Sequence, residues 1–574
     1  DGNITRMAYF GPDGAPCLHS DGIHGWSAEY DPEGNETVRT YFDKDGSPVN
    51  ISSGYARSKQ VWEGGRLKEW ACFGTGGEPA VDNTNGTHRT CREYDSQGYQ
   101  ARETYYGPDG KPCLRKDGNH GWEAEHDSAG NETRKTFLGL DGSPVSLSDG
   151  YATVRSECDQ NGNVVRRTYY GADGSRCLHK EGNHGWKALH NLQGNEVERT
   201  YFGLHGEPVS LGDRYATVRQ EYDAEGKRVL LCTYYAPDGS PCLHREGNHG
   251  YRVKYDDSGR EIERTFLNVE GEPVALANGY ATSRVARDAQ GRAIGFSYYD
   301  DKDLPVEDSS DGTHKWVIQR DALGNAVRIT YYAPDGQPCL HKDGNHGRVF
   351  VYDHLGNELE CTYLGVDGKP VALSGYATVR REYGPNGRVI RETYFNVDGK
   401  PCLNENGFHG MSMVYDDRGN KETTLIGLDG KPLALSDGLA IVRQEYGPNG
   451  KVTRETYFDT DGEPCLYEEG YHGVSAAYDD QGNETERTYL GLDGKPAALS
   501  DGYATVRKEY GAGDKVTRET WFGADGAPYL TKAGCHGVSL TYDDRGNEVE
   551  RTYFGLDGKP CESHEECVQT EYSY

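Results

Sequence analysis

The stretch from Tyr503 to Pro528, YATVRKEYGAGDKVTRETWFGADGAP, decides the fold. Its first eight residues, Tyr503–Tyr510, are rich in β-branched and aromatic side chains, which is typical of a β-strand. A short turn follows. Its commonest form is Asp-x-x-Gly-Asn, where Asp bonds its own backbone and Gly or Asn accepts a positive φ. A second strand then closes on a Gly-x-Asp-Gly-x-Pro turn. The stretch therefore predicts a β-hairpin.

The same unit recurs along the whole chain. The proline after the Asp-Gly turn returns every 31 to 33 residues, with Arg176 in its one vacancy, so the chain holds about eighteen units. An isolated hairpin is marginal in water, so the units must stack on one another, joined by looser segments of about twelve residues. We predict an all-β, elongated repeat array (a β-solenoid or superhelix). Residues 1–560 are expected to form one continuous array, and residues 561–574 a C-terminal tail or incomplete repeat.

Composition excludes several classes of protein. Only 34% of the 574 residues are apolar, and the mean hydropathy is -0.84, which is too polar for several large globular cores. The formal charge is -30, which argues against nucleic-acid partners and anionic membrane surfaces. No stretch of eighteen apolar residues occurs, so we expect no membrane insertion. The chain begins and ends within repeats, which predicts either end-to-end association or a fragment of a longer protein.

Two forms of the unit alternate, which gives a working period of two units. One form reads Pro-Cys-Leu-x-x-x-Gly-x-His-Gly and the other Pro-Val-x-Leu-x-x-Gly-Tyr-Ala, as at Tyr151. We interpret the Tyr as the alternate of the His, since both are flat rings with a polar tip. These rings either pack and bond a turn carbonyl, or form a ladder that binds an extended polymer. The candidate binding ladder is His24, His120, His184, His249, His346, His409, His472 and His536.

The cysteine of the first form has two interpretations. Cys17, His19 and His24 offer the thiolate and imidazole ligands of a zinc site. The same position holds Val49 in the other form, which favours a small buried apolar slot. Copies of the slot lie too far apart for disulfides, so most of the fifteen cysteines are predicted to be thiols. Cys561 and Cys567, beyond the last regular turn, are the expected exception.

Two kinds of feature on the turns and strand ends suggest binding. The turns Asp43-x-Asp45 and Asp459-x-Asp461 resemble the start of calcium loops, so weak calcium binding is an open alternative to a purely structural turn. No other cofactor is expected. Aromatic pairs close each second strand, as in Tyr105-Tyr106, and one ring of each pair should face outward. The outer rings either form a stripe suited to sugars or lateral contacts, or are covered by neighbouring loops.

The Tyr-Asp-x-x-Gly-Asn motif, as in Tyr30-Asp31 and Tyr352-Asp353, resembles the tyrosine–aspartate repeats of Rhs and teneurin-type proteins. The strand end Thr456–Gly462 also looks like the aromatic hairpins of choline- and glucan-binding cell-wall repeats. The period here is longer than in either family. The resemblance implies a bacterial, surface-associated or secreted β-repeat protein, and it carries over no ligand site.

We expect no enzyme, because equivalent groups occur in every unit whereas an active site is normally a single pocket. The sequence predicts a non-catalytic structural or adhesive protein, extracellular or at the cell surface, that self-assembles into a fibre or shell or binds other surface proteins. The alternative is a glycan- or peptidoglycan-binding module with an aromatic ladder. The predicted thiols leave a cytoplasmic location open.

Overall fold

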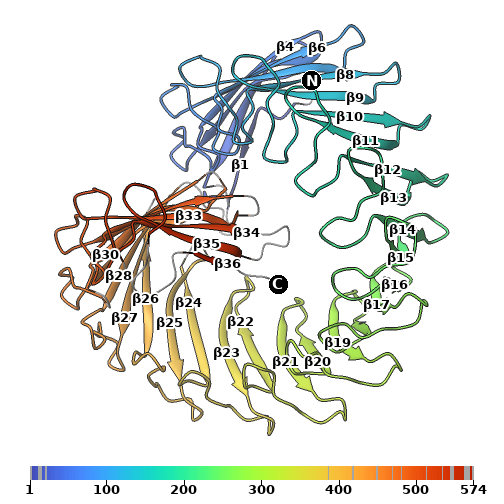
Figure 1. Cartoon of the computed structure of the whole chain (residues 1–574). Coiled ribbons are helices and arrows are strands. Elements are labelled where there is room, and N and C mark those ends of the chain that lie inside the picture. Colours follow the sequence, from blue (N-terminus) through green and yellow to red (C-terminus); the bar gives the residue numbers. More distant parts are fainter. Residues whose placement is uncertain are drawn as a thin grey trace. The chain divides into compact units, whose positions relative to one another are not determined.

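A computed structural model describes residues 3–10, 16–19, 22–384, 387–416, 419–447, 450–467, 470–479, 481–511, 514–532, 534–542, 548–561 and 569–571. All elements in these ranges are β-strands, 36 in number, and they recur with the period of the sequence (Figure 1). The predicted all-β repeat array is confirmed. Of the predicted tail, residues 562–568 and 572–574 lie outside the described residues, and Gln569–Glu571 form the last strand, β36.

The chain divides into two compact units, Asp1–Arg245 and Glu246–Tyr574. The strands of the first unit are β1 (Arg6–Ala8), β2 (Gly25–Tyr30), β3 (Glu36–Phe42), β4 (Arg57–Glu63), β5 (Arg66–Phe73), β6 (Arg89–Tyr94), β7 (Gln100–Tyr106), β8 (Gly121–His126), β9 (Glu132–Leu138), β10 (Thr153–Cys158), β11 (Val164–Tyr170), β12 (Gly185–His190), β13 (Glu196–Phe202), β14 (Thr217–Tyr222) and β15 (Val229–Tyr235).

The strands of the second unit are β16 (Gly250–Tyr255), β17 (Glu261–Leu267), β18 (Thr282–Arg287), β19 (Ala293–Tyr299), β20 (Lys315–Arg320), β21 (Ala326–Tyr332), β22 (Gly347–Tyr352), β23 (Glu358–Leu364), β24 (Thr378–Tyr383), β25 (Val389–Phe395), β26 (Gly410–Tyr415), β27 (Lys421–Ile426), β28 (Ile441–Tyr446), β29 (Val452–Phe458), β30 (Gly473–Tyr478), β31 (Glu484–Leu490), β32 (Thr505–Tyr510), β33 (Val516–Phe522), β34 (Gly537–Tyr542), β35 (Glu548–Phe554) and β36 (Gln569–Glu571).

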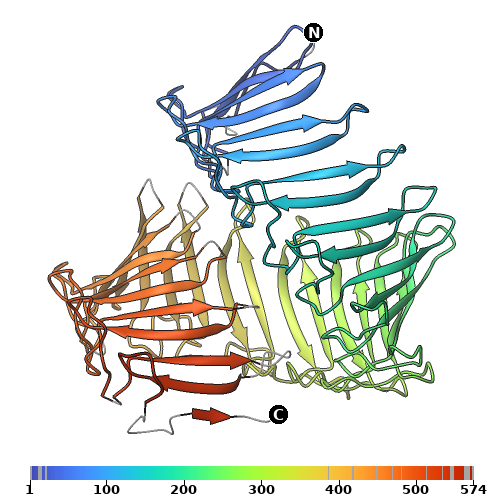
Figure 2. The same cartoon turned by 45° about the horizontal axis from the view of Figure 1, so that its top comes forward.

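Within each unit every strand pairs antiparallel with the next, so the hairpins lie side by side (Figure 2). Pairing is long inside a hairpin and short between hairpins. In the β6–β7 hairpin six residue pairs run from Arg89↔Tyr106 to Tyr94↔Gln100, with a register shift next to the turn. Strands β7 and β8 share only three pairs. The shift is a β-bulge, which twists the strands and ends regular pairing at the turn end.

A side-chain hydrogen bond joins neighbouring hairpins beyond the end of the short ladder, and we call it the cross-hairpin bond. The hydroxyl of Tyr94, just before the Asp turn, donates to the carbonyl oxygen of Leu67 in the preceding hairpin at 2.9 Å. The same bond runs from Tyr30 to Ile4 (2.9 Å), Tyr222 to Glu196 (3.1 Å), Tyr352 to Ala326 (3.1 Å), Tyr383 to Glu358 (3.0 Å), Tyr415 to Val389 (3.1 Å), Tyr478 to Val452 (2.9 Å), Tyr510 to Glu484 (2.9 Å) and Tyr542 to Val516 (2.9 Å).

Some units that lack the tyrosine keep the bond with a different donor. Trp62 donates from Nε1 to the carbonyl of Glu36 at 2.7 Å, and Arg320 donates from Nε to the carbonyl of Ala293 at 2.9 Å. The bond therefore requires a long side chain with a donor at its tip rather than a tyrosine as such.

The segments between hairpins are not loose, contrary to the expectation from the sequence. After the Asp-Gly turn the chain folds back, so that Cys113 N donates to Tyr105 O at 3.1 Å, and a third turn closes between Arg115 N and Asn119 O at 2.8 Å. Adjacent loops are then joined by backbone bonds from Asn83 N to Ser53 O (2.8 Å), Lys116 N to Asn85 O (3.1 Å), Lys180 N to Asp149 O (2.9 Å), Ser309 N to Asn278 O (2.8 Å), Lys342 N to Asp311 O (2.8 Å) and Glu405 N to Ser374 O (2.9 Å).

Removing one cross-hairpin bond should loosen one hairpin junction. We expect Tyr478→Phe to lower the free energy of unfolding by about 1 kcal/mol, since it leaves the Val452 carbonyl without this donor. Urea unfolding followed by circular dichroism measures the change, and hydrogen exchange should locate it at β29–β30. Tyr446→Phe is the matched control, because that hydroxyl donates to Gln444 Oε1 within its own strand. Equal losses in both variants would contradict the bridging role.

Candidate functional site

The histidines of the candidate ladder are packing residues in this structure. Seven of them have exposed fractions of only 3–7%. The Nδ1 atom of His120 lies 3.1 Å from the carbonyl oxygen of Cys113, so Nδ1 carries the hydrogen, and the ring meets Tyr106 edge-on at 5.6 Å. Corresponding contacts join Nδ1 to the loop carbonyl at His24 (3.0 Å), His184 (2.9 Å), His346 (3.1 Å), His409 (2.9 Å), His472 (3.2 Å) and the half-buried His536 (3.2 Å).

Each ring thus ties its loop to the strands. His249 is equally buried, at 5% exposure. Polymer binding by these rings stays a prediction, and it would require the loops to open because the rings are covered.

The tyrosine of Gly-Tyr-Ala is not the structural counterpart of the histidine, and the interpretation of the two as alternates is wrong. The N–H of His120 donates to the carbonyl of Leu138, and the N–H of Ala152 makes the corresponding bond to Tyr170. Alanine therefore occupies the histidine register. The histidine stands two residues after its glycine, whereas the tyrosine stands one residue after its own. A one-residue offset moves a strand side chain to the opposite face of the sheet. The alanines at this register are all 0% exposed: Ala56, Ala152, Ala216, Ala281, Ala377, Ala440 and Ala504.

The tyrosine of Gly-Tyr-Ala instead joins a row of rings on the other face of the sheet. Tyr151 packs against Tyr169 with ring centroids 4.8 Å apart, and against Phe137 at 6.1 Å. In the aromatic pair that ends β7, Tyr105 is 2% exposed and Tyr106 lies half-buried beneath the Arg89 guanidinium. In this pair neighbouring groups cover both rings, which favours that alternative over an exposed outer stripe.

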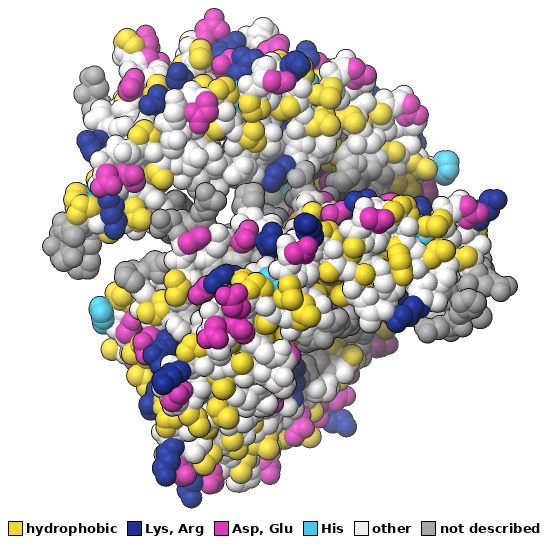
Figure 3. Space-filling view, turned by 90° about the vertical axis from the view of Figure 1, so that its left-hand side faces the viewer, with side chains coloured by type: hydrophobic (Ala, Val, Ile, Leu, Met, Phe, Trp, Pro, Cys, Tyr) yellow, Lys and Arg dark blue, Asp and Glu magenta, His cyan; other side chains and the backbone are white. Residues whose placement is uncertain are grey.

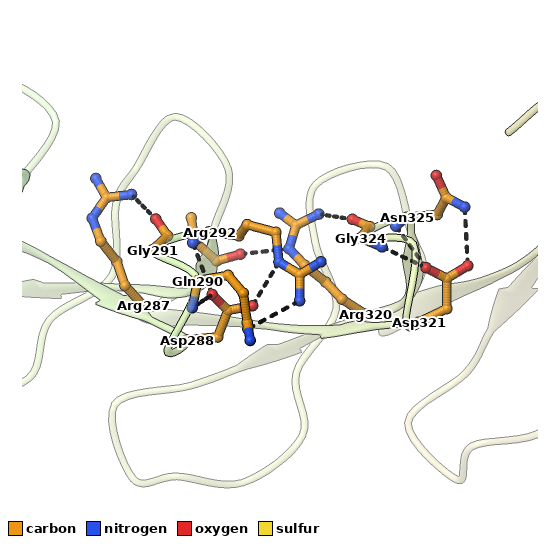
Figure 4. Close-up of polar contacts among 10 residues, drawn as sticks. Arg287, Asp288, Gln290, Gly291, Arg292, Arg320, Asp321, Gly324 and Asn325 are labelled. Carbon is orange, nitrogen blue, oxygen red and sulfur yellow. Dashed lines mark hydrogen bonds and ion pairs between the residues drawn. The ribbon is translucent and has the colours of Figure 1, made fainter.

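The aspartates of the Tyr-Asp turns hold the turn backbone. Asp321 Oδ1 accepts from Gly324 N at 2.7 Å and Asn325 N at 2.8 Å, and Oδ2 accepts from Asn325 Nδ2 at 2.9 Å (Figure 4). In the preceding hairpin Arg292 replaces the asparagine, and its Nε donates to Asp288 Oδ2 at 2.7 Å. Desolvation raises the pKa of Asp321, but these donors outweigh it and hold that pKa below its usual range. The side chain of Asn131 likewise lowers the pKa of Asp127.

The predicted calcium residues lie in Asp-Gly turns of the same kind. Asp43 Oδ1 accepts from the N–H groups of Asp45 (3.0 Å) and Ser47 (2.9 Å). Asp459 Oδ1 makes the equivalent bonds to Asp461 N (2.9 Å) and Glu463 N (3.0 Å). Within the described ranges no three His, Cys, Asp or Glu side chains gather around a point that could hold a metal ion. Calcium binding at these turns stays a prediction.

Acid should weaken the fold through the turn aspartates. Their pKa is lower in the folded than in the unfolded chain, so their stabilisation is complete above about pH 4 and is lost as the pH falls through the folded pKa. We expect the urea midpoint to fall between about pH 4 and pH 2. A triple variant, Asp127→Asn, Asp159→Asn and Asp353→Asn, should show a smaller fall. A midpoint that rises on acidification would contradict this account.

The cysteines of the predicted slot, such as Cys113, are half-buried, whereas the fully buried Cys72 and Cys361 stand elsewhere in the repeat. Cys113 N donates to Tyr105 O and Val145 N to Phe137 O, which confirms that Cys and Val share one position. No disulfide joins the cysteines that the structure describes. Burial raises the pKa of Cys72 to about 12 and that of Cys361 to about 11, so these thiols resist forming the thiolate that metal ligation needs.

One cysteine pair should be an exception under oxidising conditions. The Sγ atoms of Cys535 and Cys561 lie 3.2 Å apart, whereas Cys567 lies outside the described residues. Treatment with diamide, which is reduced as the two thiols are oxidised, should link them, and non-reducing peptide mapping should find the joined peptides. Cys465→Ser should leave the link intact and Cys561→Ser should abolish it. A pair that stays reduced while other thiols react would contradict the prediction.

The first unit contains a pocket that the sequence did not reveal. A cavity of about 330 Å³ opens on the face of β7–β11 that carries the ring row. Its rings are Tyr105, Trp122, Phe137, Tyr151 and Tyr169. Its polar lining is Arg115, Asp117, Asn119, Glu132, Lys135 and Arg167.

No family model matches the chain, and no curated protein sequence matches it. Solved structures show low similarity. The Photorhabdus luminescens Tc holotoxin pore is 12% identical over 92% of this chain and 30% of its own, with a TM-score of 0.23. A TcdB2–TccC3 structure without its hypervariable C-terminal region is 12% identical over the same shares, with a TM-score of 0.24. A TcdB2–TccC3–Cdc42 structure is 11% identical over 94% of this chain and 30% of that one, with a TM-score of 0.24. The chain thus spans about a third of the length of these chains.

The surface carries no strong segregation of charge on the face drawn in Figure 3, where acidic and basic side chains are interspersed with hydrophobic ones. Among the residues described, no helix is long and apolar enough to cross a bilayer.

Proposed function

We propose that this chain is a non-catalytic structural or adhesive repeat protein, located outside the cell or on its surface, that associates with itself or with other surface proteins. The cross-hairpin bond carries the proposal, since it recurs along both units and makes each hairpin depend on its neighbour. The side chains that could most readily take part in chemistry, histidine and aspartate, also serve to hold the scaffold together. The Nδ1–H of His120 holds a loop carbonyl, and the carboxylate of Asp321 holds a turn.

The charge of the chain suggests how association would be controlled. A formal charge of -30 makes copies repel one another at low ionic strength, and a divalent cation would reduce that repulsion. Turn aspartates such as Asp45 and Asp461 are exposed and available to such a cation.

Negative-stain electron microscopy tests assembly. We expect ordered fibres or closed shells that form with millimolar calcium and disperse when a chelator is added. The variant with Asp43, Asp45, Asp459 and Asp461 changed to Asn separates turn-bound calcium from general screening, because under screening alone a variant with four fewer negative charges should assemble at least as readily. Separate particles under every condition would overturn self-association. Protease treatment of intact producing cells tests the location, since a surface protein is cleaved without lysis.

A second candidate function is glycan binding. The pocket of the first unit favours it, because aromatic rings and polar groups line one cavity of the size that small-ligand sites have. Titration calorimetry with short oligosaccharides tests this candidate without reference to assembly.

A further inference from the structure

The face that carries the ring row also carries a row of inward-facing charges, and their pairing follows a rule. In six of the seven second strands that begin with Glu, an Arg or Lys three residues later is held by that Glu, and in β23 Cys361 stands there instead. In β13, Arg199 Nη2 lies 2.6 Å from Glu196 Oε2, and in β9, Lys135 Nζ lies 3.2 Å from Glu132 Oε2. The same pairing joins Arg39 to Glu36, Arg264 to Glu261, Arg487 to Glu484 and Arg551 to Glu548.

Arg167 of β11 stands in this row but breaks the rule. Val164 occupies the place of the glutamate, and Ser156 faces Arg167 across the hairpin. No carboxylate lies within ion-pair distance of Arg167 among the residues described, and its Nε is buried without a hydrogen-bond partner. Its Cζ atom lies over the Trp186 ring, 5.6 Å from the ring centroid. Because a partly buried cation without a counter-ion is costly, the scaffold alone gives no reason for it.

Arg167 lines the 330 Å³ cavity together with other groups that lack partners. Asn119 is 2% exposed, and its Oδ1 accepts no hydrogen bond. Arg115 donates from Nη1 to Tyr105 OH at 3.2 Å, but its Nε is buried without an acceptor. The lining residues therefore hold one buried acceptor and two buried donors without protein partners, in addition to the uncompensated charge. The Oδ1 atom without a partner recurs at Asn183, Asn248 and Asn345, so that acceptor is a feature of the repeat.

The rings supply the apolar part of the site. The rings of Tyr151 and Tyr169 pack at a tilt with centroids 4.8 Å apart, and Lys135 Nζ covers the Trp122 ring at 3.9 Å. Lys135 and Glu132 neutralise each other, and Asp117 lies in the lining with Arg115, so the guanidinium of Arg167 is the charge left for a ligand.

We infer that this cavity binds an acidic sugar residue, a pyranose ring that carries a carboxylate. A carboxylate matches the planar guanidinium of Arg167. Sugar hydroxyls both donate and accept, so the same ring satisfies Asn119 Oδ1 and the spare Nε of Arg115. The C–H face of the pyranose packs on the aromatic side chains. A purely aromatic acid would leave Asn119 without a donor. The inference rests on the second candidate function, glycan binding, and names its ligand class.

Calorimetry with di- and trigalacturonate, the matching neutral galactose oligosaccharides and benzoate tests the inference. We expect the acidic sugars to bind at least about tenfold more tightly than the neutral ones, which corresponds to one charge-assisted pair. Arg167→Gln should weaken binding of the acidic sugars by about 10- to 100-fold and leave neutral sugars unchanged.

Two further variants separate binding from folding. Val164→Glu supplies the carboxylate that the sister strands have, so it should occupy Arg167 and weaken acidic sugars to the same degree while keeping the urea midpoint. Arg166→Gln is the matched control, because Arg166 lies on the opposite face of β11 and pairs at 3.6 Å with Glu157. It should leave the affinity unchanged.

Equal binding of acidic and neutral sugars that is indifferent to Arg167→Gln would overturn the inference and keep glycan binding. Binding of no sugar would overturn both. Benzoate binding as tightly as galacturonate, with the same dependence on Arg167, would overturn the assignment to a sugar and identify a site for aromatic carboxylates.

Discussion

The hydrogen bond from a side-chain donor to the carbonyl of the preceding hairpin supplements the short backbone ladder between hairpins, so that the two together hold neighbouring hairpins in place. Strands β5 and β6 share three register pairs, from Glu69↔Cys91 to Ala71↔Arg89. Beyond Cys91 the strands no longer pair, and three residues later Tyr94 reaches across to Leu67 O. The backbone bonds between loops act at the opposite end of the strands. The junction of β5 and β6 is therefore held by hydrogen bonds at both ends and paired in the middle, which is what a stack of individually marginal hairpins requires.

The alternation of the two forms follows from what fills the space at the loop end. Where the register residue is His120, its ring bonds the Cys113 carbonyl and packs on Tyr106. Where it is Ala152, the side chain is small and fully buried, and the neighbouring Tyr151 packs on the opposite face of the sheet. In this pair of units the large group thus lies on one face in one form and on the other face in the next. Later histidine units carry a ring on both faces, since Phe408 packs near Tyr394 in the ring row while His409 bonds the Cys402 carbonyl.

Much of the fold follows from the sequence, because the deciding signals are local. Strand propensity, the Asp turn and the Asp-Gly turn predict the hairpins without knowledge of their neighbours. Two features depend on a neighbour and were missed. The equivalence of His120 with Ala152 is fixed by bonds to Leu138 and Tyr170 on the paired strand, and in the sequence its signal is only the equal spacing of both residues from the preceding glycine, which the similarity of the two rings obscured. The loops were expected to be loose because the backbone hydrogen bonds that order them are made to the neighbouring loop, as from Lys116 N to Asn85 O, and a single loop sequence does not reveal them.

The candidate site was missed for a different reason, which concerns how departures from a repeat should be interpreted. Trp62 and Arg320 depart from the tyrosine of their position, yet both keep a donor on the same type of carbonyl, so the scaffold explains them. Arg167 keeps the residue type of its row but loses the carboxylate, because Val164 has replaced the glutamate. The first kind of departure preserves an interaction, and the second leaves an uncompensated charge beside spare hydrogen-bonding groups in a cavity. A comparison of the units by their interactions, and not by their residue types, distinguishes these two kinds of departure. Only the second kind leaves a group without a protein partner, to which a ligand could bind.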